Sequence, residues 1–289
     1  MKFRNRGCKA SVLHPRRPGR VARLSLGAVA ALGALGLAVP PAWADYSPPT
    51  SGLVGWWRAN GDATDSSGNG HNGALQGGMG FTTGVYGQAF NSSAGKRVFV
   101  PDSPAFQLTS MTIAGFAYPT LRGYSFFFRG DNRSDLDPYT FGMDNSNSNC
   151  VFVLTDATGA HSQLETSTPM RFNEWHHYAA TLDGTTHDMR IYVDGVLTAQ
   201  TTATVTPYLV LDSSQVPGVG IGNVQNFYDF PWNGGIDETV LYNRALSPAE
   251  VASLAVVPEP SSVMLAILGA SGALLLRACR RGRRRDSAR

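Results

Sequence analysis

Between residues 53 and 242 the chain is divided into short apolar or alternating segments by clusters of glycine, asparagine, aspartate and serine. No helical period persists there for three turns. Short alternating segments at this spacing are typical of strands packed in two sheets. We expect strands at residues 53–57, 88–91, 97–100, 111–118, 124–129, 139–143, 150–155, 175–182, 189–193, 196–200, 219–222 and 235–242. The sequence therefore predicts an all-β fold, a two-sheet antiparallel β-sandwich.

Two local signals refine this prediction. Asp194-Gly195 separates two apolar segments, and this dipeptide favours a two-residue hairpin turn because both positions need a positive φ. Ser247-Pro248 is followed by Glu250, which is a capping-box pattern with proline at the first helical position. We therefore expect one short helix, ending near Ala255.

The charges are sorted along the chain. Of the 24 Lys and Arg residues, eight lie in residues 1–44 and seven in residues 258–289, whereas 19 of the 21 Asp and Glu residues lie in residues 45–257. Nine basic and nineteen acidic residues remain in this middle part, so its net charge is about −10. A basic chain would suggest nucleic acid as a partner, but the basic residues lie in the flanking segments. Nucleic-acid binding is therefore excluded.

Residues 1–44 have the three parts of a secretory signal peptide: basic residues up to Arg23, an apolar run over 24–39, and small residues at 42 and 44. Signal peptidase reads the side chains three and one residues before the cut, so we expect cleavage between Ala44 and Asp45. The alternative is a permanent N-terminal anchor, which the short apolar run disfavours.

Residues 257–289 contain Pro258-Glu259-Pro260, an apolar stretch at 263–276 that predicts a transmembrane helix, and an Arg cluster at 277–285. The cluster is expected on the cytoplasmic side. In this order the three parts closely resemble the PEP-CTERM sorting signal of Gram-negative bacteria. The resemblance implies processing near the tripeptide by a membrane enzyme of the exosortase family. A plain tail anchor is the alternative.

Six motifs in the middle of the chain resemble the laminin G-like jelly roll of the concanavalin A-like superfamily. They are G-L-V-G-W-W (52–57), D-S-S-G-N-G-H-N-G (65–73), G-Q-A-F (87–90), E-W-H-H-Y-A (174–179), I-Y-V-D-G (191–195) and G-G-I-D-E-T-V-L-Y-N-R-A-L-S (234–247). The resemblance implies a jelly-roll domain over 45–256 that binds carbohydrate or protein, often with a structural calcium ion. The cysteine pair that one subclass of the family carries is absent, because Cys150 is the one cysteine of this domain.

A calcium ion requires six to eight oxygen ligands. The turn that begins at Asp65 combines a carboxylate and the amide of Asn69 with glycines, including Gly70, that let successive carbonyls converge. Asp237 adds a second carboxylate if the first and last strands pair, as they do in the family. We therefore predict Ca²⁺ at Asp65, Asn69, Gly70 and Asp237. The alternative is a solvated Asx turn without an ion.

Sugar binding requires flat aromatic faces with amides and carboxylates around them. Residues 226–233 hold four aromatic side chains just before the last strand. We expect Tyr228 and Trp232 to form a ligand platform with Asn233 beside them. The Asn- and Ser-rich segment 144–149 is a second candidate.

Related sandwich folds include glycoside hydrolases, which need two carboxylates across the scissile bond. The pattern E-x-D-x-x-E is absent, and alternation predicts that Asp237 and Glu238 point to opposite faces. His176 and His177 should alternate in the same way, so they cannot together bind one metal ion, and we expect a packed histidine beside Trp175. No G-x-S-x-G, H-E-x-x-H or P-loop motif occurs.

These observations predict an exported, non-catalytic module that binds an extracellular polysaccharide or matrix component. The resemblance at the C-terminus implies anchoring in the inner membrane by the C-terminal helix until processing, then residence at the cell surface or in the extracellular matrix. The alternatives are a glycoside hydrolase and a passive surface or adhesion protein that binds protein partners.

Overall fold

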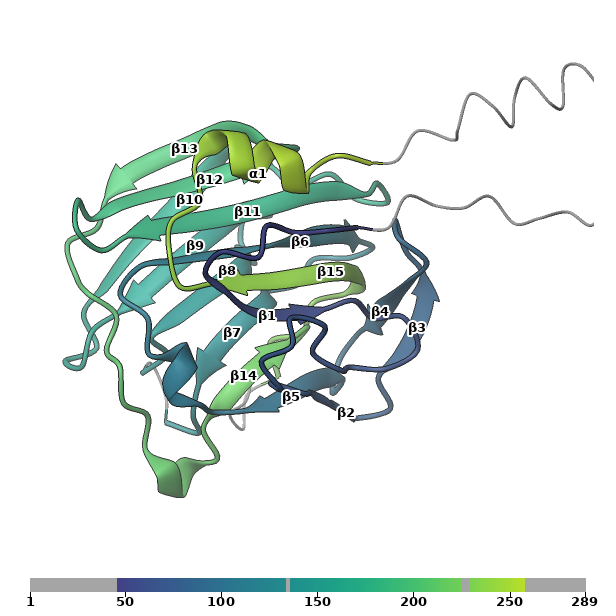
Figure 1. The fold of residues 1–289 in the computed structure, drawn as a ribbon, viewed down its shortest axis with the longest axis horizontal. Coiled ribbons are helices and arrows are strands. Elements are labelled where there is room, and N and C mark those ends of the chain that lie inside the picture. The colour runs from purple at the N-terminus through teal and green to yellow at the C-terminus, as the bar shows by residue number, and fades with distance from the viewer. Residues whose placement is uncertain (1–45, 134–135, 225–228, 258–289) are drawn as a thin grey trace, which may run out of the picture. The chain divides into compact units, whose positions relative to one another are not determined.

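The computed structural model describes residues 46–133, 136–224 and 229–257, and within them the predicted two-sheet antiparallel sandwich is confirmed (Figure 1). The first sheet has the order β13 (Val196–Thr202), β12 (Asp188–Val193), β11 (His176–Asp183), β6 (Met111–Pro119), β15 (Gly234–Tyr242), β4 (Gln88–Ser92) and β3 (Gly80–Thr83), with β1 (Leu53–Trp57) also paired to β15. The second sheet has the order β10 (His161–Pro169), β9 (Asn149–Thr155), β8 (Tyr139–Met143), β7 (Ser125–Gly130), β14 (Gly218–Ile221), β5 (Arg97–Pro101) and β2 (Ala74–Gln76).

The main hydrophobic core lies between the two sheets. Large side chains from both inner faces are completely enclosed there, among them Trp57, Phe127, Phe152 and Ile191. Alternate residues of each strand supply this layer, which is why the period of two in the sequence was a sufficient guide to most strands.

A second apolar cluster covers the outer face of the first sheet. The helix α1 (Pro248–Leu254) contributes Val251 and Leu254, which pack with Tyr192 of β12, and Tyr46 packs on Phe116 of β6. The predicted capping box is present, because the side chain of the N-cap serine and that of Glu250 each accept a backbone N–H from the other. The outer face is therefore closed by the segments at both ends of the domain.

The sequence predicted no strand where the structure has β2, β3 and β10. β10 presents mostly polar side chains, and its buried positions are Ser162, Leu164 and Thr166. A single large apolar residue in nine gives no alternation that can be recognised in the sequence. The predicted hairpin at Asp194-Gly195 is confirmed, with φ of 50° and 76°.

The expectation that Asp237 and Glu238 point to opposite faces is wrong. Asp237 and Val240 pair with Phe116 and Ala114, two residues on the outer face of β6, so one extra residue of β15 is accommodated between them. Glu238 lies in this bulge with φ of 50°. Such a bulge interrupts the alternation of side chains, and both carboxylates therefore lie on the outer face of the first sheet.

The polar and aromatic loops of the sandwich lie together at one of its ends. The pairs Gly234↔Pro119, Gly234↔Ser92 and Met143↔Cys150 place the strand ends together. We call this the loop end; it comprises residues 93–96, 120–124, 144–148, 170–175, 194–195, 222–224 and 229–233.

The flanking predictions fall outside the described residues. These are the signal peptide 1–44 with its cleavage between Ala44 and Asp45, and the sorting segment with Pro258, Glu259 and Pro260 and its transmembrane helix. Within 46–133, 136–224 and 229–257, no helix has the length and apolar character needed to cross a membrane.

Candidate functional site

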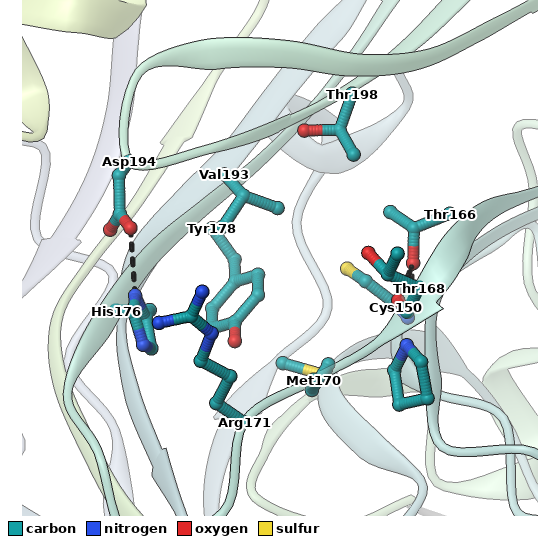
Figure 2. A pocket seen from close by; sticks show the side chains of 11 residues that line it. Cys150, Thr166, Thr168, Met170, Arg171, His176, Tyr178, Val193, Asp194 and Thr198 are labelled. Carbon is teal, nitrogen blue, oxygen red and sulfur yellow. Dashed lines mark hydrogen bonds and ion pairs between the residues drawn. The ribbon is translucent and has the colours of Figure 1, made fainter.

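A pocket of about 260 Å³ opens at the loop end, between the edges of the two sheets (Figure 2). The second sheet contributes Cys150 of β9 and the end of β10, followed by Met170 and Arg171. The first sheet contributes His176 and Tyr178 of β11, together with residues from β12, β13 and the turn between them. The pocket thus joins side chains from segments up to 48 positions apart in the sequence.

One side of the pocket is charged. His176 Nδ1 lies 2.7 Å from Asp194 Oδ2, and His176 Nε2 lies 3.2 Å from Glu174 Oε2. Both contacts are hydrogen bonds at once only when both ring nitrogens carry a proton, that is, in the imidazolium form. The side chain of Arg171 is 71% exposed, and its Nη1 lies 3.6 Å from Glu174 Oε2. The pocket is therefore lined on this side by Arg171, His176 and Asp194, with the carboxylate of Glu174 next to the first two.

The other side of the pocket combines sulfur-containing side chains with threonine hydroxyls. Figure 2 shows Cys150 and Met170 across the pocket from His176 and Asp194. Burial raises the pKa of the Cys150 thiol well above its usual range, so the thiol is neutral. The hydroxyl of Thr166 accepts the N–H of Cys150 at 3.0 Å and donates to the carbonyl of Thr168 at 2.8 Å, which leaves it one lone pair for a further hydrogen bond.

A pair of aromatic rings lies at the loop end. Phe230 is 43% exposed, and its ring centroid is 5.4 Å from that of Tyr124, with the planes inclined at 48°. Arg122 donates from Nη1 to the carbonyls of Asn145 and Ser146, at 3.4 and 3.1 Å. The predicted polar segment 144–149 therefore lies beside the aromatic pair.

Hydrogen bonds fix the position of Phe230. Its carbonyl accepts the N–H of Ser125 at 3.2 Å, and its N–H donates to the side chain of Asn223 at 3.0 Å. Asp229, the preceding residue, accepts the N–H of Gly95. The backbone that carries the ring is thus held in place before any ligand arrives, which lowers the entropy cost of binding.

The prediction that Trp232 forms a ligand platform is wrong. Its side chain is completely buried and packs edge-on against Phe126 in the main core. Tyr228 lies outside the described residues. Asn233 donates from its side-chain amide to the carbonyl of Arg122, and its contact with a ligand stays a prediction.

The turn at Asp65 is organised by hydrogen bonds. The carboxylate accepts N–H groups of Trp56, Ser67 and His71 at 2.9 to 3.0 Å. The amide of Asn69 donates to two carbonyls of β1. The Asp65 carboxylate, which we predicted to bind the ion, thus accepts backbone N–H groups. This arrangement is that of an Asx turn, the alternative to a calcium site.

The residues predicted for calcium do not form one ligand set. Trp57 of β1 pairs with Asp65 on one edge and with Thr239 of β15 on the other, so β1 separates Asp65 from Asp237. No group of three His, Cys, Asp or Glu side chains suited to a metal occurs in the described part of the chain. The geometry does not fit the combined set of Asp65, Asn69, Gly70 and Asp237, and calcium binding itself stays a prediction.

The carboxylates of Asp237 and Glu238 are both fully buried. Asp237 Oδ2 accepts the N–H groups of Val85 and Tyr86, at 2.7 and 2.9 Å, and Glu238 accepts the indole N–H of Trp56. Burial raises the pKa of Asp237 to about 7 and that of Glu238 to about 8. A raised pKa suits a general acid, but this pair is closed to solvent and lies on the outer face of the first sheet. It therefore does not reach a substrate in this conformation.

The two adjacent histidines have different surroundings, as alternation predicts. His177 is fully buried, and its ring lies edge-on to Phe116 with centroids 5.1 Å apart. Burial lowers the pKa of His177 to about 4, so this imidazole is neutral. Trp175 packs instead on Tyr118. Of the two histidines, His176 is the one that faces the pocket.

Residues 92–252 match the model of the concanavalin A-like lectin/glucanases superfamily, over more than half of the chain. This chain belongs to that superfamily. Superfamily membership agrees with the resemblance inferred from the motifs and with the sandwich. Comparison with curated proteins gave no match.

Three solved structures illustrate the similarity of this superfamily member to known folds. Domain 4 of AbnA, an extracellular GH43 arabinanase from Geobacillus stearothermophilus solved in complex with arabinotriose, has 20% identity and a TM-score of 0.57, covering 71% of this chain and 98% of that one. The binding domain of Paraclostridial Mosquitocidal Protein 1 has 17% identity and a TM-score of 0.55, covering 71% and 52%. The receptor binding domain of the botulinum neurotoxin C/D mosaic serotype has 14% identity and a TM-score of 0.55, covering 72% and 51%. The chain thus spans about half the length of the two toxin domains, and these similarities concern the fold alone.

The sequence missed the two features that define the site. Phe230 was within the aromatic segment, but nothing local distinguished it from Trp232. Of the pocket residues, Arg171 lies in the connection before β11, His176 is the first residue of β11, and Asp194 lies in the turn after β12. No spacing in the sequence brings Asp194 to the other two. The one signal in the sequence for these pocket residues was that a polar residue stands at the end of a predicted strand.

Proposed function

We propose that this protein is an exported, non-catalytic carbohydrate-binding protein whose loop end contacts an extracellular polysaccharide. The observation that carries the proposal is the exposed ring of Phe230, which packs on Tyr124 and whose backbone is fixed by hydrogen bonds. Aliphatic C–H faces of a sugar ring stack on such aromatic surfaces, while hydroxyls bond polar groups around them. Arg122 and the segment 144–148 supply those polar groups.

The charge of the domain favours a neutral glycan. Residues 45–257 carry nine basic and nineteen acidic side chains. A surface of net negative charge repels a polyanionic ligand at low ionic strength. We therefore propose a neutral polysaccharide.

Three of the structural neighbours support binding over catalysis. Domain 4 of the arabinanase was solved with arabinotriose bound, and the toxin domains are named as binding or receptor-binding domains. Their names are consistent with a binding role for this fold, and the role of this chain is our proposal.

Export and sorting are part of the same proposal. The segment 1–44 supports secretion with cleavage between Ala44 and Asp45, and 257–289 supports an inner-membrane anchor that an exosortase-type enzyme removes near Pro258-Glu259-Pro260. We propose that the domain then resides at the cell surface or in the extracellular matrix of a Gram-negative bacterium.

A glycan array read in parallel with a reducing-sugar assay tests the proposal. The full-length protein, purified in detergent, is expected to retain one class of neutral glycan without releasing reducing ends. Turnover of any array ligand would favour the hydrolase instead. Retention of matrix protein without a glycan signal would favour an adhesion protein.

Phe230→Ala tests the site. Stacking on one ring face buries about 50 Å², which at about 25 cal/mol per Å² corresponds to roughly tenfold in affinity. We expect that loss for the array ligand, by calorimetry, with an unchanged melting temperature because Phe230 is exposed. Leu121→Ala, an exposed apolar residue of the same end, is the control and should have a smaller effect.

Calcium is a separate, sequence-based prediction. It requires a melting temperature that rises with calcium, falls with chelator, and loses this difference in Asp237→Ala. Identical melting curves with calcium and with chelator would leave Asp65 as an Asx turn alone.

A further inference from the structure

We infer that the pocket of Figure 2 is a second subsite of the glycan-binding surface, and that it holds one uncharged, hydroxyl-bearing sugar ring. The ring lies on a floor of neutral side chains, and its hydroxyls bond Asp194, Arg171 and two threonines at the rim. Ionised sugars, both uronic acids and amino sugars, are disfavoured there. This inference rests on the proposed function and adds to it the residues of a subsite and the class of sugar.

The pocket has a neutral floor and a polar rim. Cys150, Met170 and Tyr178 are buried and form the floor. Burial raises the pKa of the Cys150 thiol and of the Tyr178 hydroxyl well above their usual ranges, so neither carries a charge. The rim consists of four exposed polar side chains, which are Thr168, Arg171, Asp194 and Thr198. A neutral floor with polar groups around it suits a sugar ring, whose hydroxyls project from its edge.

The rim has both acceptors and donors for hydroxyl groups. Asp194 accepts the N–H of His177 at 3.0 Å with one oxygen, and each of its carboxylate oxygens can accept a further hydrogen bond. The hydroxyl of Thr198 donates to the carbonyl two residues before it at 3.1 Å, and its oxygen can accept. The guanidinium of Arg171 is a donor only. Because a hydroxyl group both donates and accepts, adjacent hydroxyls of one ring can bond all three.

The charges at the rim balance one another. Arg171 and Asp194 carry opposite charges, and next to them the imidazolium form of His176 lies 3.2 Å from the carboxylate of Glu174. An ionised group placed among these charges is attracted by one sign and repelled by the other, whereas its loss of hydration is not offset. A hydroxyl group avoids that cost and still forms its hydrogen bonds. The rim therefore favours an uncharged sugar.

The size of the pocket selects a single ring. Pockets for drug-sized ligands span about 300–1,000 Å³, and this one is about 260 Å³. A glycan chain therefore reaches the pocket with one residue, while the neighbouring residues of the chain stay outside.

The pocket and the aromatic pair belong to one continuous surface. One carbonyl of the segment 144–148 accepts the N–H of Met170 at the pocket floor. Two other carbonyls of this segment accept from Arg122, which lies two residues before Tyr124. A glycan with one residue in the pocket can therefore extend towards Phe230.

The test titrates nine sugars into the full-length protein in detergent at pH 6, followed by ligand-observed NMR. The sugars are glucose, galactose and mannose, each with its uronic acid and its 2-amino derivative, which are ionised at this pH. We expect the neutral sugar that binds best to bind about fivefold more tightly than either of its ionised derivatives. That factor is the scale of one interaction between exposed charges.

Two charge variants should shift this preference in opposite directions. Asp194→Asn removes the anion of the rim, so the uronic acid should gain affinity relative to the neutral sugar. Arg171→Gln removes the cation, so the amino sugar should gain instead. Asparagine tolerates the positive φ of residue 194 and keeps an acceptor for the N–H of His177, so the hairpin is preserved. Asp188→Asn removes the same charge at the far end of β12 and is the matched control, which should leave the preference unchanged.

A second pair of variants locates the preference in the pocket. Thr198→Trp places a large ring at the rim, at an exposed position, and should abolish the preference among the nine sugars. Thr202→Trp, exposed on the same strand, is its control and should keep the preference. Phe230→Ala should keep it as well, because Phe230 does not line the pocket.

The outcomes separate the two levels of the proposal. If the wild-type protein bound neither an array glycan nor any of the nine sugars, the proposed function would be wrong, and this inference with it. Suppose instead that it bound an array glycan through Phe230. The assignment of the pocket alone would then be overturned if none of the nine sugars bound, if the ionised derivatives bound as well as the neutral sugar, if Asp194→Asn and Arg171→Gln caused no opposite shifts, or if Thr198→Trp kept the preference.

Discussion

The buried carboxylate of Glu238 should make the domain less stable as the pH rises. Its side chain is enclosed with that of Asp237 under Tyr46, and the neighbouring cation is Arg58, 3.5 Å away. Burial raises the pKa of Glu238 to about 8, far above the value of an unfolded chain. The native state therefore holds a proton that the unfolded state releases.

The sign and size follow from proton linkage. A carboxyl whose folded pKa is raised contributes stability that is complete below the unfolded pKa and is lost as the pH rises through the folded pKa. Each pH unit in this interval lowers the free energy of unfolding by about 1.4 kcal/mol. From pH 6 to pH 8 the loss through Glu238 is about 2 to 3 kcal/mol, or roughly 5–10 °C in melting temperature for a domain of this size. Asp237, with a pKa of about 7, acts in the same direction.

The assay is thermal unfolding of the full-length protein at pH 6 and pH 8, followed by near-ultraviolet circular dichroism. Glu238→Gln keeps an acceptor for the indole of Trp56 but has no proton to lose, so its melting temperature should fall much less over this range. Glu250→Gln is the control. The pKa of Glu250 is held at about 2 by Arg244 and Ser247, so its removal should not change the slope between pH 6 and pH 8. Equal slopes for wild type and Glu238→Gln would refute the reasoning.

Further perturbations test the core, a buried ion pair, the helix cap and the sorting segment. Trp232→Ala should cost about 3–5 kcal/mol by leaving a core cavity, seen as a lower urea midpoint, and a loss of glycan affinity without a loss of stability would contradict its place in the core. Asp102→Ala leaves the fully buried Arg129 without its carboxylate at 3.0 Å and should cost about 3 kcal/mol by the same measurement. Ser247→Ala removes the N-cap of α1 and should cost about 1 kcal/mol. Replacing Pro258-Glu259-Pro260 by alanine should keep the protein in the membrane fraction, and intact mass of extracellular wild-type protein that still includes Arg289 would refute the sorting proposal.

Residues of β15 illustrate where sequence reasoning stops. The strand itself was predicted from its apolar alternation, and both its pairing with β1 and its place in the first sheet agree with the family resemblance. The bulge at Glu238 was not predicted, because a glutamate at positive φ carries no local signature. That single extra residue reversed the expected orientation of Glu238 and placed two carboxylates on one face.

The prediction that the aromatic segment before β15 exposes Trp232 to a ligand was wrong for a related reason. Trp232 and Phe230 are two positions apart, so the period of a strand assigns both to one face. In the structure Trp232 fills the core and Phe230 is 43% exposed, since the chain reaches β15 through an irregular connection in which alternation does not apply. Only packing against Phe126 and Tyr124 distinguishes the two rings.

The sequence by itself determined the sandwich, most of its strands, the hairpin at Asp194-Gly195 and the capped helix, because alternation, turn residues and caps act between neighbours along the chain. Only the tertiary structure decided the pocket. Cys150, Arg171 and Asp194 meet there because the edges of the two sheets come together, and the facing of two edges depends on the packing of the whole core. Contacts of that kind have no period along the chain from which they can be inferred.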